Sequence, residues 1–264
     1  MELTLNEELD PTRLRELITG RWGSSLTVLE STESTMDDAS KAARAGVPDG
    51  HVIVADGQTS GRGAHGREWA SPKGSDLYLS IVARPEVEPS STALVTLATG
   101  LGVRDCAAAW LPNRRVEVKW PNDIWIEGRK CAGILVESRM LGSKIEAVII
   151  GIGLNVNRAQ WPPDLEGIAT SLRAERDEDA PLDRNEVLAM LLDNVERWVN
   201  RLIRDGAAVL VSALRPHLCL VGEPVRWEEG RGVFEGIDER GAARIRTDAG
   251  IATLHAAHIE PATR

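Results

Sequence analysis

The chain has 264 residues, with 31 Lys+Arg against 40 Asp+Glu and a formal net charge of −9. Hydrophobic residues make up 42% and charged residues 27%, which is ordinary for a soluble globular protein. The acid excess argues against a protein that binds by neutralising many nucleic-acid phosphates. No apolar run approaches the roughly 18–20 residues of a membrane span, and the acidic N-terminus lacks the apolar core of a signal peptide. We therefore expect no nucleic-acid partner, no membrane association and a cytoplasmic location.

The first half of the chain predicts alternating helices and strands. Apolar spacing and glycine stops define these elements in chain order: a helix over 9–20, a strand over 26–31, a helix over 36–46, a strand over 51–56, a polar glycine-containing loop over 57–75, a strand over 76–84 and a helix over 90–110.

The second half predicts a mixed region followed by short strands. It contains β-like runs over 115–126, 130–138 and 144–151, an irregular connection over 158–184, helices over 185–206 and 207–216, and strands with glycine turns from 221 onward. We therefore expect an α+β fold with a large domain over 1–216 and a small β-barrel over 217–264.

The three cysteines do not form a recognisable framework. Cys106, Cys131 and Cys219 are widely spaced, with no C-x-x-C pair among them. An odd, scattered set is neither a disulfide framework nor a zinc site. We expect each of them to be a small buried apolar residue rather than a catalytic thiol.

The segment QTSGRGAHGREW, residues 58–69, is rich in glycine and arginine. Its glycines allow backbone conformations that point N–H groups at a ligand, and its arginines suit phosphate or carboxylate oxygens. It has neither the G-K-[ST] of a Walker loop nor a following helix signal. From these residues alone, an anion-binding loop and a solvated surface loop are equally good interpretations.

Two further segments carry polar groups between strand-like runs. Pro121 is expected to end one strand and begin a turn within KWPND (119–123), and Lys130 opens the next strand, which also contains Gly133. Apolar IIGIGLNVN (149–157) ends in Gly-x-Gly with Asn155. A strand-opening lysine is often only solvated, and the glycines are also compatible with a plain turn.

Taken together, these motifs resemble those of the biotin–protein ligases, also called biotin–[acetyl-CoA-carboxylase] ligases. The matching segments are GRGAHGREW (61–69), KWPND (119–123), GRKCAGILVE (128–137) and GIGLN (151–155). Their order and spacing agree with the family from about Leu26 to Leu172, and the terminal β segment is similar to the family's SH3-like barrel. The resemblance implies a mixed-sheet catalytic domain of the biotin–lipoate ligase type, related to class II aminoacyl-tRNA synthetases.

The activity implied by the resemblance has two steps. Biotin and MgATP give biotinyl-5′-AMP and pyrophosphate, and biotin then passes to one lysine of a biotin carboxyl carrier domain. Joining two anions requires cations and N–H groups, so positioning and electrostatics are expected to dominate. Mg²⁺ is expected to enter with ATP rather than in a protein cage.

The resemblance also assigns roles to residues of this chain. The catalytic set is Lys130, Arg62 and Asp123. The biotin-binding set is Ser34, Thr35, Met36, Gln58, Gly61, Arg62, Gly63, Ala64, Lys130 and Gly133. The nucleotide-binding set is Arg67, Trp69, Asn122 and Asn155. A wider group of basic residues is also expected to face ATP: Arg62, Arg67, Lys73, Lys119, Arg129 and Lys130.

Two departures from the family pattern concern the biotin end. Ala64 stands where the family usually has arginine, and Met36 stands where asparagine is common. Loss of the arginine removes a cation that would help to retain the adenylate. We therefore expect some escape of biotinyl-AMP onto other amines.

Three questions remain open at this stage. Lipoate–protein ligases and octanoyltransferases share the architecture, although the transferases need a nucleophilic cysteine and Cys131 is a poor candidate. An RNA-binding module is disfavoured by the charge and by the lack of stacking aromatics. About thirty residues precede Ser34, so we expect the monofunctional type without a DNA-binding domain. A monomer and a homodimer that pairs through an edge strand near 144–150 both stay open.

Overall fold

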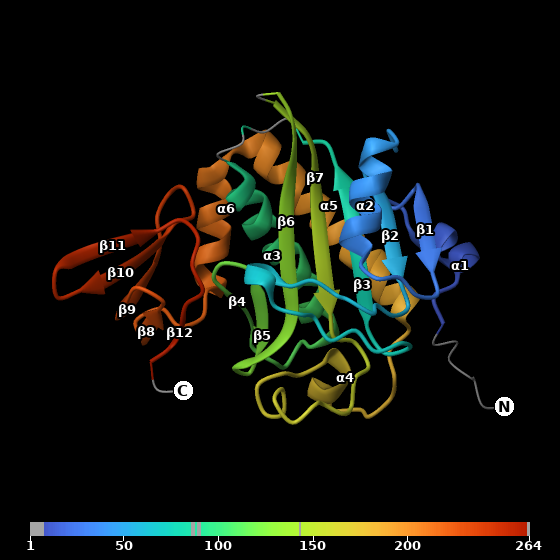
Figure 1. Cartoon of the computed structure of the whole chain (residues 1–264). Helices are drawn as coiled ribbons and strands as arrows, with labels where there is room; N and C mark the ends of the chain where they lie inside the picture. Colours follow the sequence, from blue (N-terminus) through green and yellow to red (C-terminus); the bar gives the residue numbers. More distant parts are fainter. Residues whose placement is uncertain (1–7, 86–87, 89–90, 143, 263–264) are drawn as a thin grey trace.

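Two β-sheets organise the chain in the computed structural model, which describes residues 8–85, 88, 91–142 and 144–262 (Figure 1). The larger, seven-stranded sheet has the order β1-β2-β3-β7-β6-β5-β4. Its strands are β1 (Leu26–Leu29), β2 (His51–Ala55), β3 (Leu77–Ala83), β4 (Val116–Lys119), β5 (Asp123–Ile126), β6 (Arg129–Leu141) and β7 (Lys144–Leu154). The β1–β2 pair is parallel and the other neighbours are antiparallel, so the predicted mixed sheet is confirmed.

Helices cover both faces of this sheet (Figure 1). The helices are α1 (Pro11–Leu17), α2 (Thr35–Arg44), α3 (Thr92–Trp110), α4 (Leu172–Glu175), α5 (Arg184–Asp205) and α6 (Ala207–Leu214), with 3₁₀ turns η1 (Ala64–Gly66) and η3 (Arg215–His217). Helices α3 and α5 pack together on one face, and α2 packs on the other against β3 and β7. Strand β2 serves both faces: Val52 and Val54 join the larger core, whereas Ile53 packs with α2.

The long helix α5 follows directly from the spacing of its apolar residues. Val187, Leu191 and Val195 recur every four residues and are buried. Asp183 caps the first turn with its side chain. A side chain at Gly102 of α3 would place its Cβ 2.6 Å from the Cα of Val195, so glycine allows these two helices to approach closely.

The smaller sheet is antiparallel and has the order β11-β10-β9-β8-β12. Its strands are β8 (Pro224–Trp227), β9 (Gly230–Ile237), β10 (Ala243–Thr247), β11 (Gly250–Leu254) and β12 (Glu260–Pro261). Phe234 and Ile245 are fully buried in the same core as the larger sheet. Trp120 donates a hydrogen bond from Nε1 to the Gly241 oxygen at 2.9 Å. The expected α+β class is therefore observed, while the division at 216/217 stays a prediction.

Most predicted elements are found, with two corrections. The run over 115–126 is two strands separated at Pro121, as the predicted turn required, but the helix expected over 9–20 is only Pro11–Leu17. Strand β7 is paired on both sides from Val148 onward, by β3 and β6, so the expected edge near 144–150 is wrong for 148–150, whereas residues 144–147 pair, among the described strands, with β6 alone. No helix in the described part of the chain is both long and apolar enough to cross a membrane.

Candidate active site

A cavity of about 260 Å³ lies where the predicted motifs converge. Thirteen of the predicted site residues line it: Ser34, Thr35, Met36, Gln58, Arg62, Gly63, Ala64, Arg67, Trp69, Asn122, Lys130, Gly133 and Asn155. Gly61 and Asp123 are not among the lining residues. The geometry therefore brings together segments that are far apart in the chain, and it places these two immediately behind the wall.

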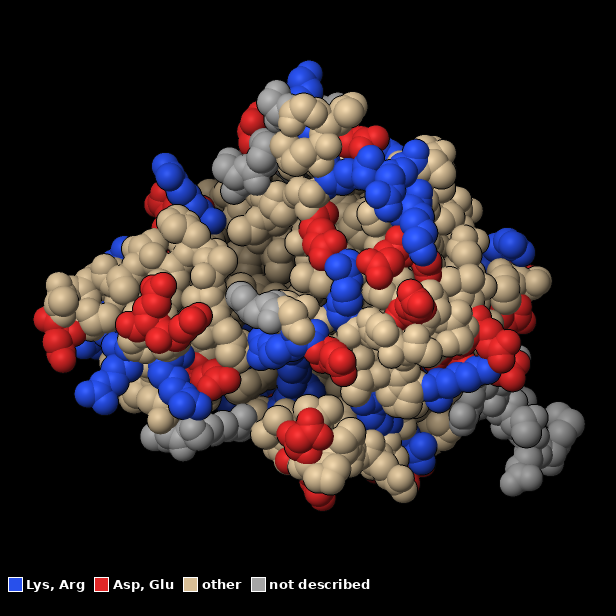
Figure 2. Space-filling model, in the orientation of Figure 1, with Lys and Arg blue, Asp and Glu red and all other residues tan. Residues whose placement is uncertain are grey.

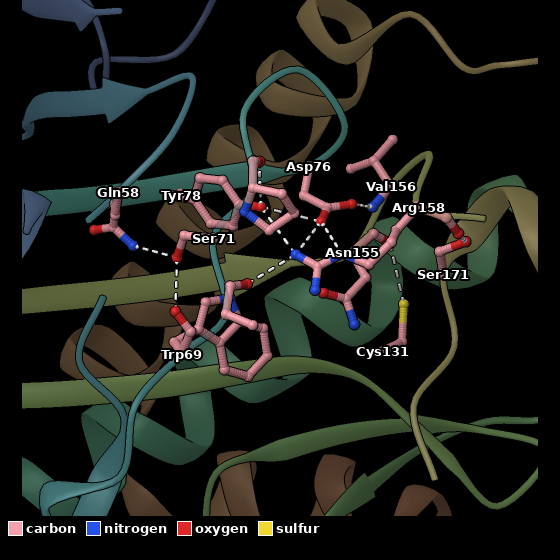
Figure 3. Close-up of polar contacts among 12 residues, drawn as sticks. Gln58, Trp69, Ser71, Asp76, Tyr78, Cys131, Asn155, Val156, Arg158 and Ser171 are labelled. Atoms are coloured by element: carbon pink, nitrogen blue, oxygen red, sulfur yellow. Dashed lines mark hydrogen bonds and ion pairs between the residues drawn. The ribbon is translucent and has the colours of Figure 1, made fainter. Parts of the chain in front are cut away.

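One group of polar side chains comes from the start of α2 and from Gln58. Ser34 is 1% exposed, and its Oγ has no hydrogen-bond partner among the described residues. Gln58 Oε1 accepts from the Thr35 N–H at 2.9 Å, and Gln58 Nε2 donates to Ser71 Oγ at 2.9 Å (Figure 3). A buried hydroxyl without a partner costs free energy, so Ser34 is available for a polar group of a ligand.

Trp69 forms a wall of the cavity and packs against β6 and β7 at positions where each strand has a glycine and therefore no side chain. A Cβ on Gly153 of β7 would lie 2.4 Å from Trp69 Cε2, and one on Gly133 of β6 would lie 2.7 Å from Trp69 Cζ3. Gly61 is needed for a different close approach, because its Cβ would lie 2.5 Å from the Trp69 oxygen. These glycines therefore fix the position of the indole ring.

Lys130 enters the cavity from β6 with a carboxylate behind it. Its Nζ lies 2.6 Å from Asp123 Oδ1 and 5.2 Å from the centre of the Trp69 ring. Asp123 Oδ2 lies 3.6 Å from Nζ of Lys119, a side chain that is almost fully buried. Burial lowers the pKa of Lys119, while the Asp123 charge opposes that shift and Lys130 adds to it. Asp123 thus forms ion pairs with both Lys119 and Lys130.

The two loop arginines are held by other elements. Arg62 Nη2 lies 3.2 Å from Asp37 Oδ1 of α2 and 3.2 Å from Glu137 Oε2 of β6. Arg67 contacts the His258 ring, just before β12, at 3.3–3.4 Å. The loop over 58–69 is therefore tied both to the large sheet and to the C-terminal sheet.

The structure brings only half of the wider basic group predicted to face ATP to the cavity. Arg62, Arg67 and Lys130 line the cavity. Lys73 instead pairs with Glu30 at the surface, Lys119 is buried behind the wall, and Arg129 pairs with Glu175 at 2.6 Å. The space-filling view shows basic side chains gathered at the centre of one face with acidic ones beside them (Figure 2).

Sequence reasoning missed the contribution of the connection that follows β7. Although it is irregular, as predicted, its residues Arg158, Trp161, Leu165 and Ile168 line the cavity. Its backbone is fixed to β6, since the Lys130 N–H donates to the Ile168 oxygen at 2.9 Å. Arg158 and Trp161 were the available signal, because a cationic and an aromatic side chain stand together directly before two prolines in this stretch.

Arg158 is the centre of a buried polar network (Figure 3). It is 5% exposed; its Nε donates to Asp76 Oδ2 at 2.7 Å, and its Nη2 donates to the Ala70 oxygen at 2.8 Å. Asp76 also accepts from the Val156 N–H and from the Tyr78 hydroxyl. The network therefore joins the end of the glycine–arginine loop to β3 and to the exit of β7.

The cysteines are free and buried, as expected. Cys131 Sγ donates to the Asn155 oxygen at 3.4 Å rather than facing the cavity. Burial raises the pKa of Cys131 well above its ordinary value and raises the pKa values of Cys106 and Cys219 to about 12. None of the three is suited to act as a thiolate nucleophile.

Comparison with known proteins agrees with this geometry. Residues 28–155 match the model of the biotin/lipoate A/B protein ligase family. The bifunctional ligase/repressor BirA of Bacillus subtilis is 33% identical over 243 residues, which cover 88% of this chain and 72% of that protein. The biotin–[acetyl-CoA-carboxylase] ligase of Paracoccus denitrificans is 33% identical over 238 residues, covering 88% of this chain and 98% of that protein.

A solved structure gives the same result. Biotin protein ligase from Aquifex aeolicus in complex with biotin and ATP superposes with a TM-score of 0.78 at 27% identity, covering 90% of this chain and 99% of that one. The chain therefore belongs to the biotin–protein ligase family. The predicted fold and enzyme class are confirmed, and these relatives are biotin ligases rather than lipoate ligases or octanoyltransferases.

Proposed function

We propose that this enzyme activates biotin with ATP and transfers it to a lysine of a biotin carboxyl carrier domain. In the first step a biotin carboxylate oxygen attacks the α-phosphorus, the bond to the β-phosphate breaks, and pyrophosphate leaves. In the second step the lysine nitrogen attacks the acyl carbon and loses a proton while AMP leaves. The observation that carries this proposal is a single cavity that contains an unpartnered buried hydroxyl, Ser34, and a cation, Lys130.

The polar groups at the start of α2 suit the ureido ring of biotin. The bicyclic head of biotin is mostly apolar, and its ureido ring carries one carbonyl and two N–H groups. Ser34 Oγ supplies a hydroxyl without a partner, and Thr35 and Gln58 are already oriented by their bond to each other. The Met36 side chain packs directly on the backbone of Gly151, which has no side chain, and forms an apolar wall beside Ser34, Thr35 and Gln58. Few polar groups in an apolar pocket are typical of small-molecule sites.

Lys130 and Arg62 are the cations that we propose hold the carboxylate against the α-phosphate. The contribution expected from them is positioning and charge stabilisation rather than proton transfer. Arg62 has two carboxylates near its Nη2, at 3.2 Å each, so a ligand anion must compete with them. Asp123 acts through Lys130, because its Oδ1 fixes the ammonium group at 2.6 Å.

The nucleotide end is proposed to lie near Asn122 and Asn155, and Mg²⁺ would accompany ATP there. Each asparagine donates its amide nitrogen to a backbone oxygen, Asn122 to Ile134 at 2.8 Å and Asn155 to Thr170 at 2.9 Å. Their amide oxygens therefore remain acceptors, which fits a hard cation that prefers oxygen ligands. When bound, the ion would neutralise phosphate charge. Arg67 and Trp69 border the same cavity.

Asp123→Asn tests the roles of the buried carboxylate. If Asp123 positions Lys130, pyrophosphate release from biotin and MgATP should fall together with carrier biotinylation. If it instead handles the acceptor amine, as the resemblance implied, pyrophosphate release should persist and only transfer from preformed biotinyl-AMP should fall. Asp38→Asn serves as the control, because that carboxylate pairs with Lys41 and accepts from Thr32, neither of which lines the cavity. Unchanged activity of Asp123→Asn in both assays would contradict both of these roles.

A further inference from the structure

The Arg158 guanidinium is held on three sides. Its Nε and Nη2 engage the Asp76 carboxylate, which is fully buried. The same Nη2 also donates to the Ala70 oxygen at 2.8 Å and to the Tyr78 hydroxyl at 3.0 Å. The Trp161 ring lies 4.9 Å from its Cζ, at cation–π distance. A side chain fixed in this way loses little further freedom when it binds a ligand.

One nitrogen of this guanidinium, Nη1, is not used in these contacts. Within the described residues no group accepts a hydrogen bond from Nη1, since the side-chain hydrogen bonds of Arg158 come from Nε and Nη2. Arg158 nevertheless lines the cavity, three residues after Asn155. The ion pair with Asp76 thus fixes the guanidinium of a cavity-lining residue and leaves the two N–H groups of Nη1 without an acceptor in the described part of the chain.

We propose that Arg158 is a further ligand-binding residue, which donates from Nη1 to a phosphate oxygen of the nucleotide. The proposal rests on the function proposed above, in which the nucleotide lies at the Asn155 end. The guanidinium is suited to phosphate because it donates charge-assisted hydrogen bonds from a rigid plane. The biotin end is already supplied with polar groups by Ser34, Thr35 and Gln58, which belong to other segments.

The test compares Arg158→Lys and Arg158→Gln with Arg184→Lys. Arg184 is a matched control because it is also buried, being 1% exposed, and pairs with Asp56. It donates to the backbone oxygen of Asp76 at 3.1 Å but does not line the cavity. For Arg158→Gln we expect the KM for ATP to rise about tenfold or more, since a hydrogen bond to a charged group is lost. The KM for biotin should change less than about twofold, because the contact is to the nucleotide.

Several outcomes decide the matter. A phosphate contact predicts weaker inhibition by AMP with unchanged inhibition by adenosine in the Arg158 variants. Equal rises in both KM values, matching those of Arg184→Lys, would overturn the proposal and leave Arg158 a structural residue. Absence of biotin-dependent pyrophosphate release by the wild-type enzyme would instead refute the proposed function itself.

A measurement on the unaltered protein covers the case in which the variants do not fold. A crystal structure of the wild-type enzyme with biotin and a non-hydrolysable ATP analogue should place a phosphate oxygen within hydrogen-bond distance of Arg158 Nη1. A nucleotide bound with Nη1 turned away from every phosphate would overturn the proposal.

Discussion

The packing of Trp69 against bare strands leads to a quantitative expectation for Gly153→Ala. The new Cβ would lie 2.4 Å from Trp69 Cε2 and 2.5 Å from Nε1, whereas ordinary contacts begin at 3.4 Å. The indole ring or strand β7 must therefore move by about 1 Å. A ring that moves away from β7 shifts the wall that Trp69 forms.

The expected cost follows from overpacking. Inserting one methyl into a filled space costs about 1–3 kcal/mol, so the free energy of unfolding should fall by that amount. We also expect the KM for ATP to rise about tenfold, because Trp69 belongs to the proposed nucleotide end and the cavity, with a volume of about 260 Å³, has little room to adapt. Urea denaturation and steady-state pyrophosphate release measure the two effects.

Gly100→Ala is the matched control for this substitution. Its Cβ would lie 3.7 Å from Val118 and 3.8 Å from Ile134, which are ordinary contacts, and the residue sits inside α3. Alanine within a helix is more favourable than glycine by about 0.5–1 kcal/mol, so the control should be neutral or stabilising. If Gly153→Ala left both the free energy of unfolding and the KM for ATP at wild-type values, the indole would not be fixed against these strands.

Three further predictions concern the loop, the thiols and the C-terminal contact. Ala64→Arg should reduce biotinylation of a non-cognate protein while carrier biotinylation continues; unchanged leakage would contradict the role given to the missing arginine. The three cysteines should react with a thiol reagent at pH 8 only after unfolding, because burial raises their pKa values, and Cys131→Ala should keep ligase activity. Burial lowers the pKa of His258 from 6.5, with Lys119 and Arg67 adding to the shift and Glu260 opposing it. The unfolded chain therefore binds this proton more tightly, so the free energy of unfolding should decrease as the pH falls below about 6.5, and His258→Gln should flatten that slope.

The fold was predictable where local patterns decide it. Pro121 placed the break between β4 and β5, and the four-residue apolar spacing placed α5 within a residue of its observed ends. The order of strands in the sheet was not predictable in the same way. β7 lies between β3 and β6 because of long-range pairing, and no local feature of residues 144–154 distinguishes a central strand from an edge strand.

The site shows the same division. The residue types of the glycine–arginine loop and of Lys130 suit anions but also fit solvated positions, and it was the resemblance to the family's motifs that assigned them to one site; in the structure they meet in one cavity. Lys73 and Arg129 have the same charge but pair elsewhere with Glu30 and Glu175, which only the folded chain reveals. Arg158 was missed because its orientation depends on Asp76, 82 residues earlier in the chain.

The most direct test of the proposed mechanism is pyrophosphate release by the purified protein with MgATP and one acid at a time. We expect release with biotin and not with lipoate or octanoate. Lys130→Ala should abolish it, whereas Arg129→Ala, which removes the adjacent cation outside the cavity, should keep it. Release with lipoate or octanoate in place of biotin would contradict the proposed activity. Full activity in Lys130→Ala would contradict the assignment of Lys130 as the cation that holds the biotin carboxylate.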